Sequence, residues 1–133
     1  MAQGLWEKDI MPIYIKVDVT LPSLMICSFK APLSYVNAEF FMHEVLSFVK
    51  AAPPSPRWFI LRFESIGQVD YVAAKMFMEL ADRMEREQVT LGFTGLSPDL
   101  RGFLSDSGVF DVIGSNKVFD SVHEACTQSR TPH

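Results

Sequence analysis

The 133-residue sequence is poor in the residues on which disulfide scaffolds, nucleic-acid interfaces and membrane spans depend. It has two cysteines, Cys27 and Cys126, far apart in the chain, which predicts reduced thiols in a cytoplasmic protein rather than a disulfide framework. Its 12 basic residues are scattered and the net charge is −4, which argues against nucleic-acid binding and against a lipid-surface patch. No apolar run approaches the roughly 18 residues of a membrane-spanning helix, and residues 1–10 lack a signal-peptide pattern.

The motifs of metal and cofactor chemistry are also missing. His43-Glu44 and His123-Glu124 both begin like a zinc-protease motif, but neither has the second histidine four residues after the first, which favours ordinary surface or half-buried histidines. The segment 114–117 lacks the second glycine and the hydroxyl of a phosphate-binding loop. Neither cysteine lies in a catalytic signature. The sequence therefore predicts no enzymatic activity, no metal and no cofactor.

Apolar side chains, in contrast, are abundant. They make up 48% of the chain, with 11 Phe and 7 Met, enough for one well-filled core. Two interpretations of this richness stay open. The phenylalanines fill an unusually aromatic core, or some of the apolar surface is left exposed for a partner protein.

Hydrophobic periodicity predicts alternating strands and helices. Strands are expected over residues 13–19, 24–31, 58–63 and 89–94, with a short one at 117–119. Helices are expected over residues 38–51 and 72–87, from Pro98 to the turn at Gly108, and from Val122 onward. The first two strands are close enough to form a hairpin. In the first helix, Phe41, Val45, Phe48 and Val49 are expected to form the buried stripe.

Capping residues mark where the helices begin. Asn37 and Asp70 are suitable N-caps for the first two helices, and Ser97 precedes a proline at the first helical position of the third. Ser121 and Glu124 have the spacing of a capping box for the last helix.

This order of elements predicts an α/β fold. We expect a mixed β-sheet with a parallel centre, an opening β-hairpin and about four helices packed on the sheet. Residues 13–126 are expected to form a single domain, preceded by an N-terminal extension over 1–12 and followed by a flexible polar tail over 127–133.

The loop between the third strand and the second helix is the best candidate for a binding site. A strand, a loop and a helix N-terminus together can receive an anion or a partner protein. The candidate residues are Ser65, Gly67, Gln68, Asp70 and Tyr71. The plainer interpretation is that Ser65, Gly67 and Gln68 shape the loop and that Asp70 is first a structural N-cap.

Several segments of the chain resemble one family. The passage over 31–41 contains an aromatic-x-Asn-Ala element, and the strand at 58–63 is followed by a loop ending in Val-Asp-Tyr at 69–71. Further matching segments lie at 100–104, 107–110, 113–114 and 118–125. In this order and spacing they resemble STAS domains, which include the C-terminal cytoplasmic domains of SulP-type sulfate and anion transporters and the bacterial anti-sigma-factor antagonists.

The resemblance implies a regulatory or protein-interaction module without chemistry of its own. Its implied partner is the membrane domain of a transporter or a regulatory protein, and weak nucleotide binding has been proposed for family members. Antagonists are switched by phosphorylation of a Ser or Thr just after the loop Asp. Here that position is Val72, which has no hydroxyl, and Ala73 replaces a glycine found in transporter-type domains. Phosphorylation at this site is therefore not expected.

Three functions remain in competition. The first is a STAS domain of a SulP-like transporter, either excised or separately encoded, acting on the cytoplasmic face of the membrane. The second is a stand-alone binding protein like an anti-sigma-factor antagonist. The third is a nucleotide-binding sensor module.

Overall fold

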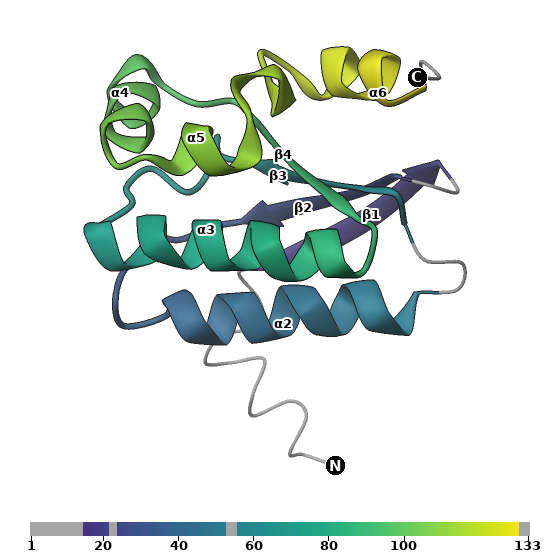
Figure 1. Cartoon of the computed structure of the whole chain (residues 1–133), viewed down its shortest axis with the longest axis horizontal. Helices are drawn as coiled ribbons and strands as arrows, with labels where there is room; N and C mark the ends of the chain where they lie inside the picture. The colour runs from purple at the N-terminus through teal and green to yellow at the C-terminus, as the bar shows by residue number, and fades with distance from the viewer. Residues whose placement is uncertain (1–14, 22–23, 53–55, 131–133) are drawn as a thin grey trace.

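A five-stranded mixed sheet forms the middle of the molecule (Figure 1). The computed structural model describes residues 15–21, 24–52 and 56–130. The strands are β1 (Ile15–Leu21), β2 (Leu24–Phe29), β3 (Trp58–Arg62), β4 (Thr90–Thr94) and β5 (Val118–Phe119), adjacent in that order. β1 pairs with β2 in antiparallel fashion, and the other three pairs are parallel. The predicted hairpin and parallel centre are therefore confirmed.

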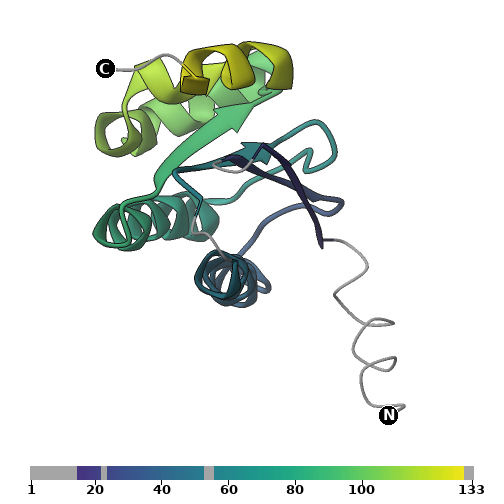
Figure 2. The same ribbon diagram turned by 90° about the vertical axis from the view of Figure 1, so that its right-hand side faces the viewer.

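Helices cover both faces of this sheet (Figures 1 and 2). They are α2 (Ala38–Ala51), α3 (Tyr71–Arg86), α4 (Pro98–Asp106), α5 (Val109–Ile113) and α6 (Val122–Arg130), with a 3₁₀ turn at Ser115–Lys117. α2 and α3 lie side by side on one face, and α6 crosses the other. The sequence did not predict α5, because five residues are too few for helical periodicity to appear.

The sheet separates two apolar clusters of unequal size. Alternation along β2 points Met25 and Cys27 toward α2 and α3, and points Leu24 and Ile26 toward α6. The larger cluster contains a triangle of edge-to-face rings formed by Phe63, Phe77 and Phe93, with centroids 4.8–5.6 Å apart. The smaller cluster consists of Leu24, Ile26, Ile60, Phe119 and Ala125 with three half-buried neighbours. Much of the phenylalanine content thus lies in the core.

The buried face of α2 differs from the prediction at one residue. Phe41, Val45 and Val49 are buried as predicted, but Phe48 is 38% exposed. The buried face extends instead to Met42 and Leu46, so its centre is rotated away from Phe48, which lies just beyond its edge. The predicted buried face of α2 was therefore wrong in its rotation about the helix axis, not in its position along the chain.

Asn37 precedes α2 as predicted, but its side chain makes no capping bond. Its Nδ2 donates to the Pro32 carbonyl (3.0 Å) and its Oδ1 accepts from the Ser34 N–H (2.9 Å). The amide thus closes the β2–α2 loop upon itself, a role for which Asn is as well suited as for capping.

The caps of the later helices agree with their motifs. Ser97 Oγ accepts from the Leu100 N–H (3.1 Å), and Ser121 Oγ accepts from the Glu124 N–H (3.1 Å). Glu124 Oε1 in return accepts from the N–H of Asp120, one residue before the cap (2.7 Å).

The remaining differences concern the ends of elements. β2 ends at Phe29 and β3 at Arg62, each earlier than expected, while β4 starts one residue later and α3 runs from Tyr71 to Arg86. α6 continues to Arg130, so residues 127–130 of the expected flexible tail are helical. The expected strand residues 13 and 14 lie outside the described residues.

Candidate functional site

Three loops meet at one edge of the sheet, where β2, β3 and β4 end. Because these strands are parallel, the loops that follow them emerge together. An isolated parallel bridge joins Leu33 of the first loop to Val69 of the second. The Leu33 N–H donates to the Gln68 carbonyl (2.9 Å), and the Asp70 N–H donates to the Leu33 carbonyl (3.0 Å). The β2–α2 and β3–α3 loops are therefore joined by backbone hydrogen bonds.

The Asp70 side chain forms hydrogen bonds to both of the segments that this junction joins. Its Oδ1 accepts from the Ala73 N–H (2.8 Å), which confirms it as the N-cap of α3. Its Oδ2 accepts from the Tyr35 N–H (2.8 Å), 35 residues earlier in the chain. Both carboxylate oxygens therefore hold backbone groups, one in its own helix and one in the neighbouring loop.

The other candidate residues of the loop have different surroundings. Gly67 has a positive φ of 79°, so its absent side chain serves the turn. Ser65 and Gln68 are exposed, and no side-chain hydrogen bond of either is found within the described residues. Tyr71 is 59% exposed, with Lys75 Nζ 5.3 Å from its ring centroid. Gly67, Gln68 and Asp70 line a common pocket, whereas Ser65 and Tyr71 lie outside it.

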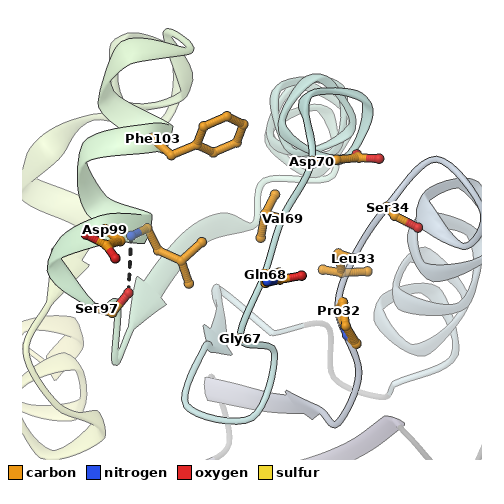
Figure 3. A pocket seen from close by; sticks show the side chains of 11 residues that line it. Pro32, Leu33, Ser34, Gly67, Gln68, Val69, Asp70, Ser97, Asp99 and Phe103 are labelled. Atoms are coloured by element: carbon orange, nitrogen blue, oxygen red, sulfur yellow. Dashed lines mark hydrogen bonds between the residues drawn. The ribbon is translucent and has the colours of Figure 1, made fainter.

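This pocket is an open hollow of about 480 Å³ between α4 and the joined β2–α2 and β3–α3 loops (Figure 3). Its described lining residues are Pro32, Leu33, Ser34, Gly67, Gln68, Val69, Asp70, Ser97, Asp99, Leu100 and Phe103. Sequence reasoning identified only the contribution of the β3–α3 loop. The adjacency of the loops after β2 and β4 was a usable signal, because parallel neighbours end at one edge.

Exposed apolar side chains surround the start of α3. Tyr35 and Val36 are each 74% exposed, Tyr71 is 59% exposed and Val72 is 48% exposed. The bond from the Tyr35 N–H to Asp70 brings the first pair beside the second. We call these four residues the apolar collar. Part of the apolar surplus is thus exposed, while most of the phenylalanine is buried in the core.

Other chemistry finds little support in the described part of the chain. Its His, Cys, Asp and Glu side chains form no group of three that could hold a metal ion. None of its helices combines the length and apolarity needed to cross a membrane. Burial raises the pKa of the Cys27 thiol from 9.0 to about 12, which opposes formation of a nucleophilic thiolate.

A mixed sheet whose βα loops meet at one edge around a capped helix defines a class of small α/β domains. The family model described as "STAS domain" matches residues 14–125, so the chain belongs to the STAS domain family. A protein of Mycobacterium tuberculosis strain CDC 1551 / Oshkosh named "Probable sulfate transporter" is 30% identical over 99 residues. That alignment covers 74% of this chain but 18% of the transporter, and the counterpart in strain H37Rv matches equally. The chain thus spans about a fifth of these relatives.

Solved structures with this fold come from both branches of the family. The murine anion transporter Slc26a9 in its inward-facing state matches with a TM-score of 0.75 and 21% identity, covering 83% of this chain and 18% of that one. A sulfate transporter family protein from Wolinella succinogenes gives 0.72 and 21%, covering 85% and 89%. An anti-sigma factor antagonist from Mycobacterium paratuberculosis gives 0.71 and 14%, covering 88% and 93%. At these identities the likeness concerns the fold alone.

Proposed function

We propose that this chain is a non-catalytic regulatory and docking domain of a SulP-like sulfate or anion transporter, acting on the cytoplasmic side of the membrane. Membership of the STAS family and 30% identity to a protein named "Probable sulfate transporter" support this assignment. The observation that carries the docking role is the apolar collar. Large apolar side chains exposed around a rigid helix start are typical of surfaces that bind other proteins.

The local architecture supports a fixed contact surface rather than a phosphorylation switch. Val72 is exposed at the position after the first residue of α3, where a switch would need a hydroxyl. Each carboxylate oxygen of Asp70 accepts one backbone N–H, so this side chain holds the Tyr35 loop against the start of α3.

Binding of the collar to a transporter can be tested directly. The chain is mixed with the purified membrane domain of the SulP-like transporter encoded in the same genome, and the affinity is measured by biolayer interferometry. The double variant Tyr35→Ser/Tyr71→Ser is expected to bind at least about tenfold more weakly, because exposed tyrosines are common hot spots of interfaces. The matched control is Val112→Ser, which removes an apolar side chain that is 51% exposed on α5.

Two outcomes would contradict this proposal. Equal affinities of the double variant and the control would show that the collar does not dock. Binding of the wild-type chain to an anti-sigma kinase and not to the membrane domain would favour the second function, a stand-alone antagonist-like protein, which the shared fold also allows. Phosphate on residues 65–73 after incubation with that kinase would overturn the assignment of a fixed surface.

A further inference from the structure

The pocket beside the collar has the wrong chemistry for an anion. Among the described residues that line it there is no Lys, Arg or His. Asp99 lines it from α4, and its exposed carboxylate makes no hydrogen bond or ion pair within the described part of the chain. Asp70 adds a second negative charge from the start of α3. A phosphate or sulfate placed here would meet two carboxylates and no cation.

The helix N-termini at this pocket do not offset those charges. The N–H of Ala73 in α3 is taken by Asp70, and the N–H of Leu100 in α4 is taken by Ser97 (Figure 3). Free N–H groups at a helix start are what make it an anion site. In both helices the N-cap side chain already accepts one of these N–H groups, which leaves fewer donors for an anion.

The floor of the pocket is apolar. Leu33 is fully buried, Leu100 nearly so, and Val69 and Phe103 are half-buried and pack against the large core cluster. An apolar floor below an acidic rim matches a side chain with a long aliphatic stem and a cationic head. The Phe103 ring adds a surface on which a guanidinium group can stack.

We propose that this pocket receives a lysine or arginine side chain from the protein segment that docks on the collar. The proposal rests on the proposed docking function and names the chemistry of the partner: apolar residues for the collar with a basic residue beside them. Asp99 pairs with the cationic head, and Val69, Leu100 and Phe103 contact its stem.

The test uses the 133-residue chain and two small probes that differ in charge. N-acetyl-arginine amide and its neutral analogue N-acetyl-citrulline amide are titrated while amide chemical shifts are recorded by NMR. The arginine probe is expected to shift the amides of Gln68, Val69 and Phe103 in a saturable way. Citrulline should bind at least about fivefold more weakly, because it lacks the charge that Asp99 recognises.

Variants on α4 isolate the acidic rim. Asp99→Asn is expected to weaken the arginine probe about tenfold, the order expected for loss of a charge-assisted hydrogen bond. Asp106→Asn, at the other end of α4 and outside the pocket, should leave the affinity unchanged. The collar variant Tyr35→Ser/Tyr71→Ser should also bind the probe normally, so failure of collar docking and failure of the pocket proposal give different results.

Three results would overturn the pocket proposal. The first is equal affinity for the arginine and citrulline probes. The second is an unchanged arginine affinity in Asp99→Asn. The third is a saturable shift of the same amides by sulfate or GTP, which would mean that the pocket accepts anions.

Discussion

At the scale of single residues, Asp70 has the largest structural role at the site. Sequence alone identifies it as an N-cap, because an Asp before an amphipathic helix is a common start signal. Its second bond, to the Tyr35 N–H, depends on a loop that is remote in the sequence. That bond turns a local cap into a clamp between the β2–α2 loop and the start of α3.

Asp70→Ala is expected to lower the free energy of unfolding by about 2 kcal/mol, combining a lost N-cap of about 1 kcal/mol with a lost charge-assisted bond. Urea denaturation followed by circular dichroism measures it. Asp106→Ala, which removes an exposed carboxylate without such bonds, should change stability by less than about 0.5 kcal/mol. A similar small effect in both variants would contradict the clamp.

Cys27 makes stability depend on alkaline pH. Its pKa is about 12 in the folded chain against 9.0 ordinarily, so the folded state binds more protons between these values. The stability from this group is complete below pH 9 and is lost as the pH rises toward 12. Between about pH 8 and about pH 10 the unfolding free energy should fall by about 1.4 kcal/mol through this thiol.

The contribution of the Cys27 thiol is the difference in this pH dependence between the wild-type chain and Cys27→Ala, both measured by urea denaturation. Iodoacetamide at mildly alkaline pH should also leave Cys27 unmodified until urea is added. Rapid modification of Cys27 in the native chain would contradict the burial of this thiol. Identical dependence of the unfolding free energy on pH in the two proteins would contradict it as well.

At the scale of elements, α3 ends in a regular motif that contains an unfavourable residue. The Val89 N–H donates to the Met84 carbonyl (2.9 Å) and the Gln88 N–H to the Glu85 carbonyl (2.9 Å), the pattern of a Schellman cap. Gln88 occupies its left-handed position with φ 64°, where glycine is usual.

Gln88→Gly is therefore expected to raise the free energy of unfolding by about 0.5–1 kcal/mol, since relief of left-handed strain exceeds the entropy cost of glycine. Thermal and urea denaturation measure the gain. Glu87→Gly is the matched control: its φ is −93°, so glycine brings only the entropy cost and should destabilise. A loss of stability in both variants would contradict the strain at Gln88.

At the scale of the whole molecule, the two faces of the sheet bury apolar clusters of unequal size. α3 packs into the large cluster on one face, whereas α6 rests on the small cluster around Ile60 and Phe119. Regions with fewer buried apolar contacts open at lower free energy than the core. α6 is therefore expected to open before α3.

Hydrogen exchange followed by mass spectrometry tests this order. Amides of α6 should exchange faster than those of α3, and Phe119→Ala should speed exchange in α6 by more than tenfold with a smaller effect in α3, because the truncated ring supports α6 directly. Ala81→Gly, on the half-buried side of α3, serves as the control that acts on the other face. Equal protection of both helices would contradict the difference.

Local sequence patterns predict the order of the strands and of every helix except α5, the opening hairpin, the parallel centre and the caps at Asp70, Ser97 and Ser121. These follow from periodicity and from hydrogen bonds between near neighbours, which the local sequence contains. Three features require the three-dimensional fold: the rotation of α2 that exposes Phe48, the collar formed by two loops, and the pocket shared with α4. Each depends on contacts between segments far apart in the chain. The rotation of α2 follows from its packing in the large cluster, and the collar and the pocket form because parallel strands bring the loops that follow them to one edge.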